Sequence, residues 1–544
     1  MTSAAETTND PFPIEWREPG DAELTWEWDD MHMPTAVTPL AGDYHLVLGA
    51  GFAYGYERLS VPYEVLTRVW NGYTYFAWKP HVPDAERAAA DERYTEARRA
   101  AIPASAAYWE HAVAEVREIY DWITHRPVET GAPADVADDW GAAWQRIART
   151  WGIHFSAIRG PYQAMEDLAD LYESVVPNAA PGEALGLIGG SVHELHEVER
   201  GLENLASLAT ANPSVERAVR LEGATVEDVA AEEGSAPFLD ALRAFLEEHG
   251  HLGQMYDDLG FPSWVEEPTI LLTEIGKRIE HSMPADAEAR RQRLADEAEV
   301  LAARARAALA GDPERLARFE ELLAHARRIG PLTEVHNYWI DRRAQSVLRR
   351  FVMRVGGRLA DARVIARPAD ILFLHREEVP ALLRDGGDVR DLVESRRAHY
   401  AHWSAVTPPR KVGKVSDPEP SGAANADRFD GQRFESTVAD ELRGTGASAG
   451  IGRGPARLTL TQDDFAAVQP GDIIVCASSN PSWVPLFAIA GGLITNTGGV
   501  LSHAAVVARE FALPAVVGTG DATTRIADGR LVEIDGTTGI VRLL

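Results

Sequence analysis

The sequence predicts a multidomain protein with a mainly α-helical region followed by a compact α/β domain. First, its 544 residues exceed the size of roughly 250–300 residues at which single hydrophobic cores stop growing. Second, residues 86–363 are rich in Ala, Glu, Arg and Leu, with apolar residues at the three- and four-residue steps of amphipathic helices. Third, the final hundred residues alternate short β-rich runs with a helix.

The start of the chain differs from the helical region. We expect residues 1–19 to be disordered, because their first ten residues have few apolar side chains. The following stretch, up to residue 85, concentrates Trp and Tyr between Gly and Pro breaks, which indicates loops and short strands or helices. These aromatic side chains either line a pocket for a flat ligand or fill a hydrophobic core.

Breaks in the pattern divide the rest of the chain. Residues 181–190, 250–262 and 311–313 contain Gly and Pro and separate several helices. Residues 406–446 are polar and rich in Pro and Gly, which predicts a flexible linker. Residues 447–544 form the α/β domain, with β-rich runs at 472–476, 531–534 and 539–543.

Composition narrows the function classes. The net charge of −30 argues against a nucleic-acid partner, because such partners require a basic face. No apolar run approaches the ~20 residues of a membrane span. The single cysteine, Cys476, excludes a disulfide framework and favours a reducing, cytoplasmic location.

His503 is the most informative residue of the α/β domain. It follows an apolar run, residues 488–494, and the glycines Gly498 and Gly499. Ser502 is suited to cap a helix that starts beside the histidine. Backbone amides and the helix dipole favour an anion there. An imidazole at such a site can carry a phosphoryl group; a capping or buried structural histidine is the alternative.

The segment from Thr495 to Glu510 reads T-x-x-G-G-x-x-S-H-A-A-x-x-A-R-E. It closely resembles the mobile phosphohistidine domain of phosphoenolpyruvate-utilising and dikinase-type enzymes, including the phenylphosphate synthase type. The resemblance extends over residues 470–475, 483–486, 513–518 and 534–539. It implies a swivelling domain in which His503 carries a phosphoryl group between two active sites. Thr495, Gly498, Gly499 and Ser502 would then hold the phosphate.

No sequence pattern in the chain indicates a nucleotide-binding site. The chain has neither a G-x-x-x-x-G-K-[ST] loop nor a G-x-G-x-x-G motif after a predicted strand, and no region resembles the ATP-grasp domain of dikinase-type enzymes. We therefore expect no directly bound cofactor, and a separate ATP-grasp partner subunit that binds ATP and Mg²⁺.

A second resemblance concerns residues 20–405. Residues 28–40, 245–251, 264–268 and 367–374 are similar to the substrate-binding domain of rifampin phosphotransferase. This implies that 20–405 is the acceptor-substrate-binding domain, mostly helical with an aromatic-rich start. After the His249-Gly250-His251 turn, however, Leu252 and Tyr256 stand where such proteins tend to have charged residues, which makes a different acceptor the expectation.

Transfer to an oxygen needs a base and cations around the phosphoryl group. Candidate bases are His251 and His249, and the further substrate-binding candidates are His32, Trp28, Tyr256 and His336. For any one histidine, a buried hydrogen-bonded role is the competing hypothesis. Cationic contacts could come from Arg342, Arg343, Arg349 and Arg350, which could equally form a solvated helix face. No His/Asp/Glu grouping has tight ligand spacing, so we predict no metal site.

These features give one leading hypothesis and two alternatives. The chain would be the acceptor and phosphocarrier subunit of an ATP-dependent phosphotransferase that phosphorylates a small phenol, whose pKa near ~10 lets a neutral histidine deprotonate it. The acceptor could instead be an antibiotic hydroxyl or a pyruvate-like keto acid. A non-catalytic binding or regulatory protein with a retained swivelling domain is disfavoured by the intact motif around His503.

Overall fold

The computed structural model describes residues 12–544, apart from 31–32, 58–62, 81, 180–181, 192–193, 254–257, 281–286, 415–433, 435–437, 439, 461, 480–483, 488 and 501. The described chain is mainly helical up to residue 404 and mixed α/β from residue 441. This order confirms the predicted fold class.

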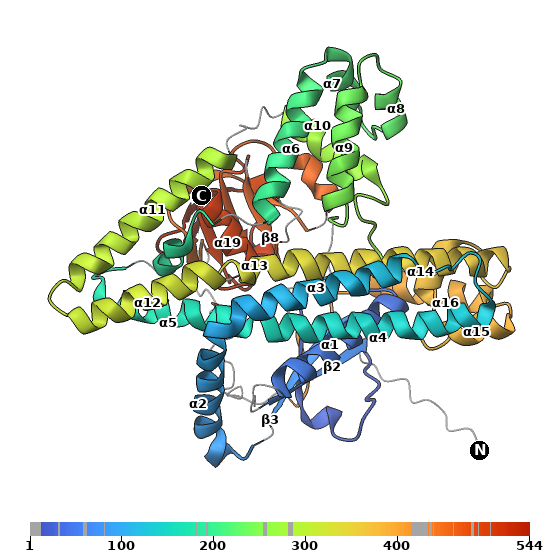
Figure 1. Cartoon of the computed structure of the whole chain (residues 1–544), viewed down its shortest axis with the longest axis horizontal. Coiled ribbons are helices and arrows are strands. Elements are labelled where there is room, and N and C mark those ends of the chain that lie inside the picture. Colours follow the sequence, from blue (N-terminus) through green and yellow to red (C-terminus); the bar gives the residue numbers. More distant parts are fainter. Residues whose placement is uncertain are drawn as a thin grey trace.

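Three long helices form the spine of the helical region: α3 (Ser105–Thr124), α4 (Pro133–Ala157) and α14 (Arg343–Asp361). They lie side by side in Figure 1, and their apolar faces meet in the largest core of the molecule. Against them pack α1 (Pro39–Glu57), the short turn η2 (Ile102–Ala104), α5 (Arg159–Val175), η5 (Pro368–Phe373) and α15 (Val379–Asp385). Helix α2 (Asp84–Ala101) packs on α5, and α16 (Arg390–Ser404) packs on η5.

A lobe and a helical hairpin extend from this spine (Figure 1). The lobe contains α6 (Glu194–Thr210), α7 (Pro213–Val219), α8 (Val226–Ala230), α9 (Ala236–His249) and α10 (Pro268–Glu280). The hairpin contains α11 (Ala287–Ala308) and α12 (Pro313–Ile329), and the short helix η3 (Glu183–Ile188) packs against it. The chain returns to the spine through α13 (Leu332–His336) and a π-helix, η4 (Asn337–Arg342).

The predicted breaks coincide with real helix ends. Helix α9 ends at His249, directly before Gly250. Asp312 caps α12, and its carboxylate accepts a hydrogen bond from the Arg315 N–H at 3.1 Å. Because this bond satisfies one of the free amides of the first turn, the Gly-Asp-Pro sequence starts a new helix here.

The aromatic-rich start forms a four-stranded sheet in the order β2-β3-β1-β4. The strands are β1 (Thr25–Trp28), β2 (Tyr63–Trp70), β3 (Tyr73–Pro80) and β4 (Lys411–Gly413); η1 (Asp21–Glu23) precedes the first. Asn71 and Gly72, with φ of 52° and 84°, join β2 to β3, as expected of a tight two-residue hairpin. The buried aromatic rings of this region pack on one another, so many of them fill a core rather than line a pocket.

Helix α1 is longer than the short elements expected here. Its glycines lower helix propensity, but they also permit close packing. A Cβ at Gly51 would lie 2.6 Å from the Cβ of Trp151 on α4, and one at Gly49 would overlap Thr67 on β2. The packing of α1 between α4 and the sheet therefore outweighs the low helix propensity of its glycines.

Residues 12–19 are ordered against the sheet, contrary to the expected disorder; residues 1–11 lie outside the described part. Phe12 is buried with its ring 5.3 Å from that of Trp403. The Trp70 indole N–H donates a hydrogen bond to the Glu15 carbonyl at 2.9 Å. Ile14 packs on the same core, the Trp16 ring lies 5.4 Å from that of Trp70, and the Asn71 amide donates to the Pro13 carbonyl at 2.9 Å, so several contacts hold this segment.

The predicted linker, residues 406–446, has strands at both ends. At its start β4 pairs with β1 of the N-terminal sheet. At its end β5 (Glu441–Arg443) and the first residues of β6 (Thr445–Ser448) join the C-terminal sheet. Backbone pairing, which composition does not reveal, thus occupies both ends of the predicted linker, and most of the residues between 414 and 440 lie outside the described part of the chain.

The C-terminal domain has an eight-stranded sheet in the order β5-β12-β11-β7-β8-β9-β10-β6. Strands β7 to β10 run parallel to their neighbours, and the flanking strands are antiparallel. Two hydrophobic cores cover the strands. The remaining elements are β7 (Ile451–Leu458), η6 (Gln462–Ala467), β8 (Ile473–Cys476), α18 (Val484–Phe487), β9 (Gly492–Thr495), α19 (His503–Glu510), β10 (Ala515–Val517), α20 (Ala522–Arg525), β11 (Leu531–Asp535) and β12 (Ile540–Leu543).

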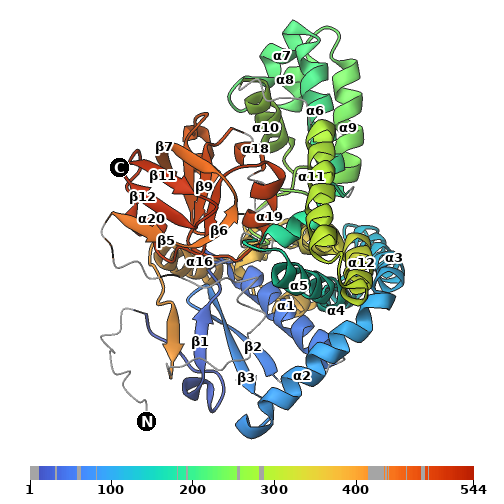
Figure 2. The same cartoon turned by 90° about the vertical axis from the view of Figure 1, so that its left-hand side faces the viewer.

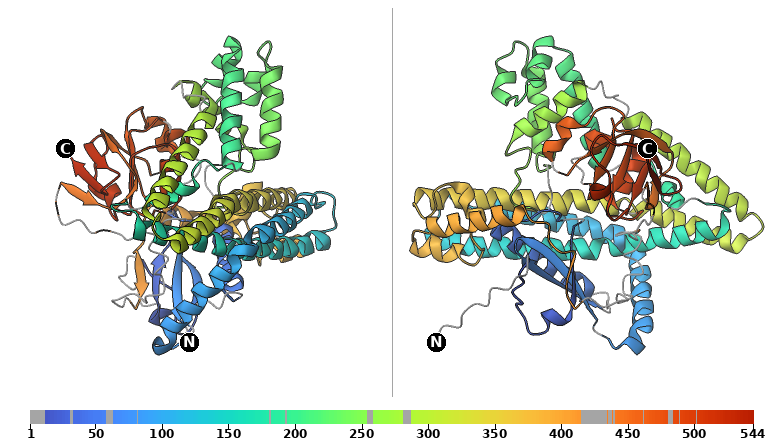
Figure 3. Two further views of the ribbon diagram at one scale, coloured as in Figure 1. Left: turned by 60° about the vertical axis from the view of Figure 1, so that its left-hand side comes forward. Right: turned by 180° about the vertical axis from the view of Figure 1, so that it is seen from behind.

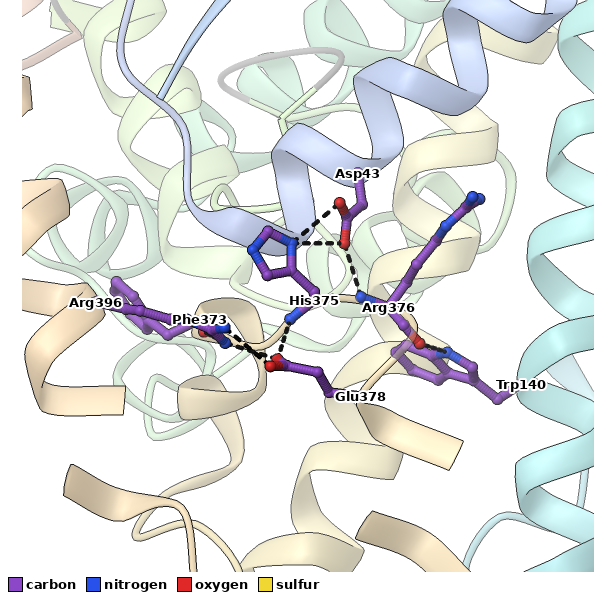
Figure 4. A network of polar contacts seen from close by, with 7 residues as sticks. All are labelled: Asp43, Trp140, Phe373, His375, Arg376, Glu378 and Arg396. Atoms are coloured by element: carbon purple, nitrogen blue, oxygen red, sulfur yellow. Dashed lines mark hydrogen bonds and ion pairs between the residues drawn. The ribbon is translucent and has the colours of Figure 1, made fainter. Parts of the chain in front are cut away.

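A polar junction fastens the end of the helical region to α1 (Figure 4). The Asp43 carboxylate lies 3.2 Å from the His375 ring and accepts the Arg376 N–H at 2.7 Å. The Glu378 carboxylate accepts bonds from the Arg396 guanidinium at 2.6 and 2.9 Å. These contacts link α1, the start of α15 and α16 with one another.

The C-terminal domain packs against the helical region instead of standing apart from it. Figures 2 and 3 show it beside α11, between the lobe and the N-terminal sheet. Helix α19 contacts α11 directly. Within the described residues, no helix combines the length and apolar character that crossing a membrane requires.

Candidate functional site

Gly498, Gly499 and Ser502 define the backbone of the loop before His503. This loop connects β9 to α19, and Ser502 stands at the N-cap position with an extended backbone. Gly498 has a φ of 99°, and a Cβ there would lie 2.7 Å from the Ser502 Oγ. Only glycine meets both constraints without strain. The Gly499 carbonyl accepts the Ser502 N–H at 3.0 Å, which closes the turn.

The side chains around this loop have different roles. Thr495 is fully buried, and its hydroxyl donates to the Thr497 carbonyl at 2.6 Å, so it holds the loop from within. Ser502 makes no capping hydrogen bond. Its buried Oγ has no hydrogen-bond partner among the described residues, and it is therefore the hydroxyl that remains available to a ligand. The His503 side chain lies outside the described part of the chain.

Arg509 ties the loop to the body of the domain. Its guanidinium donates to the Val500 carbonyl at 2.7 Å and to the Ala447 carbonyl at 3.0 Å. One side chain thus links the loop, α19 and β6. The sequence motif contained this arginine, but its position near the end of a helix gave no signal for this role.

A cavity of about 260 Å³ lies between the helical region and α19. Apolar side chains from α5, α6, α10, α11 and the turn after α9 form much of its wall. Polar groups enter from His251, Arg290, Glu334 and Arg342. Val506, Val507 and Arg509 of α19 contribute the remaining side. The helix that begins at His503 therefore forms part of the wall of this cavity.

The two histidines of the His-Gly-His turn have separate environments. His249 is buried outside the cavity lining, and its Nδ1 lies 2.8 Å from the Tyr338 hydroxyl. That hydroxyl donates to the Glu248 carbonyl at 3.2 Å, so it accepts the proton from His249. Burial lowers the pKa of His249, and its hydrogen bonds serve to hold the turn.

His251 lines the cavity. Neither imidazole nitrogen makes a hydrogen bond of good geometry with the described residues. The Tyr338 ring packs edge-on at 4.5 Å, and a contact with the Tyr338 main chain partly opposes the lowering of the His251 pKa. Burial holds the pKa of His251 well below its usual value, and the positive charge of Arg343 adds to this effect. A neutral imidazole with an unused lone pair thus faces the cavity.

The other predicted substrate residues do not gather there. Trp28 lies on β1, where its indole N–H donates to the Met33 carbonyl at 3.1 Å and its ring packs on Tyr73. No described residue before position 85 lines the cavity, because the aromatic side chains are used in the core of the small sheet. His32 and Tyr256 lie outside the described residues.

His336 is buried and is not among the residues that line the cavity. Its Nδ1 donates to the Leu332 carbonyl at 2.7 Å, and burial, with His154 nearby, lowers its pKa to about 4. His336, His154 and Asp341 meet there, with their ligand atoms within 4.8 Å of one another. Sequence spacing gave no sign of this cluster, because His154 comes from a distant helix.

The candidate arginines also differ in their environments. Arg342 lines the cavity. Arg349 is paired with Glu266 at 3.2 Å, and Arg343 stacks on the Trp339 ring. Arg290, which the sequence did not single out, also lines the cavity, and its guanidinium lies over the Phe511 ring at 4.3 Å. Both arginines line the same cavity as His251, and Arg290 is also paired with the Glu199 carboxylate at 3.4 Å.

Comparison with known proteins identifies two parts of the chain. Residues 468–539 match the family described as the PEP-utilising enzyme mobile domain. Residues 156–334 match the rifampicin phosphotransferase fourth domain. The second match includes His251 and much of the cavity wall, and the first includes His503.

Similar full-length proteins are larger than this chain. Chondramide synthase of Chondromyces crocatus is 31% identical over 98% of this chain, which spans 14% of that protein. The uncharacterised phosphotransferase YvkC of Bacillus subtilis is 29% identical over 56% of the chain, and rifampicin phosphotransferase of Streptomyces sviceus is 32% identical over 59%. The chain spans 36% of each of these two relatives.

Proposed function

We propose that this chain, which combines a rifampicin phosphotransferase-like region with a mobile domain of the PEP-utiliser superfamily, is the acceptor and carrier part of an ATP-dependent phosphotransferase. His503 would receive a phosphoryl group from a separate ATP-grasp subunit, which binds ATP and Mg²⁺. His503 would then pass that group to the hydroxyl of a small phenolic compound. One observation carries the proposal: α19, which begins at His503, and the buried His251 border the same cavity.

The transfer step follows from the groups at the cavity. His251 takes the proton of the phenol, and the phenolate oxygen attacks phosphorus. The P–N bond to His503 breaks, and its electron pair returns to the ring nitrogen, so that a ring protonated at the other nitrogen leaves as neutral imidazole. Arg290 and Arg342 stabilise the charge on the phosphoryl oxygens. His251 then releases the phenol proton to solvent, and His503 is left as the neutral imidazole that can be phosphorylated again.

A phenol suits this cavity for two reasons. Much of the wall is apolar, so a flat aromatic compound can replace water there. A phenol pKa near ~10 is also within reach of a neutral imidazole, whereas an alkyl alcohol is a far weaker acid. An antibiotic hydroxyl is the second candidate, because residues 156–334 match the rifampicin phosphotransferase fourth domain.

The first test needs no partner subunit, because phosphoramidate phosphorylates histidine chemically. We expect the wild-type chain to gain an acid-labile, base-stable phosphoryl group at His503, which mass spectrometry can locate. Added phenol should then yield phenyl phosphate, and parallel reactions with rifampicin distinguish the second acceptor.

His503→Ala is the control, and circular dichroism should show it folded. Phenyl phosphate formed by this variant at the wild-type rate would disprove the carrier role of His503. Transfer to rifampicin but not to phenol would replace the phenolic acceptor with the antibiotic and leave the carrier role intact.

A further inference from the structure

We propose that His154, His336 and Asp341 form a binding site for one divalent transition-metal ion, such as Zn²⁺. His154 lies on α4, His336 ends α13, and Asp341 belongs to the π-helix η4. All three side chains are buried, and their ligand atoms lie within 4.8 Å of one another. The site is separate from the phosphoryl-transfer proposal and does not depend on it.

The π-helix explains how two of these residues meet. His336 and Asp341 are five positions apart, and a regular α-helix would rotate them by about 140° from each other. The i→i+5 hydrogen bonding of a π-helix brings residues at this spacing towards one face. Single π-turns inside helices are rare, and those that do occur often lie at functional sites. Here the turn places Asp341 beside His154, with Nδ1 and Oδ1 2.7 Å apart.

The donor set suits a metal ion. The Nδ1 of His336 donates to the Leu332 carbonyl at 2.7 Å, which leaves Nε2 with a free lone pair. This arrangement, a ring N–H fixed by a backbone carbonyl, is common among metal-binding histidines. The cluster thus offers imidazole nitrogen and a carboxylate in a buried site.

The chemistry of the donors selects the ion. Two imidazoles and one carboxylate are typical ligands of Zn²⁺ and of other first-row divalent ions, whereas Mg²⁺ and Ca²⁺ prefer oxygen ligands. Bonds of about 2.0–2.2 Å require the widest pair of ligand atoms to approach on binding. Small side-chain rotations about the Cα–Cβ bonds can supply this movement.

Metal binding would fix the turn that supports the cavity. The π-helix also contains Tyr338, whose ring contacts His249 and His251, and Arg342, which lines the cavity. An ion held by His154 on α4 would anchor this turn to the spine of helices.

The experiment uses the full chain after removal of metal with a chelator. Titration with Zn²⁺ in a calorimeter should show one high-affinity site per chain, and Co²⁺ should give the visible absorption of a nitrogen-ligated ion. Mg²⁺ in excess should not displace either. His336→Gln and Asp341→Asn should each weaken Zn²⁺ binding more than about tenfold, the lower end of the loss seen even for outer-shell partners.

His125→Gln is the matched control, because His125 is an exposed histidine with its own aspartate neighbour, Asp121; it should leave Zn²⁺ affinity unchanged. X-ray absorption of the Zn²⁺-loaded wild-type protein should show two imidazole ligands, and this measurement does not depend on the folding of any variant. Undiminished binding by the folded His336→Gln/Asp341→Asn double variant, or wild-type spectra without imidazole ligands, would overturn the proposal.

Discussion

Two histidines that are neighbours in sequence have different environments, and this difference can be tested. His251 lines the cavity with both nitrogens free of good hydrogen bonds, whereas His249 is bonded to Tyr338. We expect His251→Ala to lower transfer from phosphorylated His503 to phenol by ~10²–10⁴-fold, the usual contribution of a general base. Phosphorylation of His503 by phosphoramidate should be unaffected.

His249→Ala is the companion variant. Its loss removes a hydrogen bond inside the turn, so we expect lower thermal stability and a smaller change in transfer than in His251→Ala. Single-turnover assays on both variants measure the two effects. If His249→Ala lowered transfer more than His251→Ala while remaining equally stable, the base would be His249.

The environment of His251 also predicts the pH dependence of transfer. A base must be neutral, and burial, with Arg343, His249 and Arg342, holds the pKa of His251 well below its usual value of about 6.5. Transfer to phenol should therefore persist as the pH falls below 6.5 and decline only at more acidic pH. Removing a nearby positive charge favours protonation, so Arg343→Gln should move this acidic decline to higher pH.

The rate of transfer across pH 5–8 tests this, with hydrolysis of phosphorylated His503 measured without phenol and subtracted. A decline centred on the ordinary histidine value, unchanged in Arg343→Gln, would assign the base to an exposed group.

At the level of elements, the segment between β4 and β5 is expected to act as the hinge. Both flanking strands are paired into separate sheets, while the intervening residues are polar and rich in Pro and Gly. Limited trypsin digestion should cleave at Arg428 or Arg433 and release a C-terminal fragment of roughly a hundred residues.

Lys411 provides an internal comparison, because it lies within β4 and pairs with β1; cleavage there should be slower. The Arg428→Gln/Arg433→Gln double variant should resist release of the fragment. First cleavage within the helical region, with residues 414–440 intact, would contradict a hinge in this segment.

At the level of the whole molecule, the proposal that a separate subunit binds ATP can be tested directly. The chain lacks a recognisable phosphate-binding loop for a nucleotide. We expect calorimetry with ATP and Mg²⁺ to show no tight binding to the chain alone, and no phosphorylation of His503 by ATP in the absence of a partner. Micromolar ATP binding would contradict the proposed separate ATP-grasp subunit.

The sequence by itself determined the features that depend on local patterns. Three- and four-residue apolar periodicity predicted the helical region, and β-rich runs predicted the α/β domain. The glycine at position 498 and the serine at 502 predicted a turn followed by a helix N-terminus beside His503. These features could be predicted because backbone conformation there is set by the residues themselves and their near neighbours.

Only the tertiary structure decided where distant residues meet. It placed Trp28 in a sheet core, away from the cavity. It also placed His251 in the cavity wall and His249 against the Tyr338 hydroxyl, although the two residues are two positions apart. It also brought His154 to His336 and Asp341 through a π-helix, whose register does not follow the 3.6-residue period. Such contacts arise from the packing of whole helices, so no spacing along the chain records them.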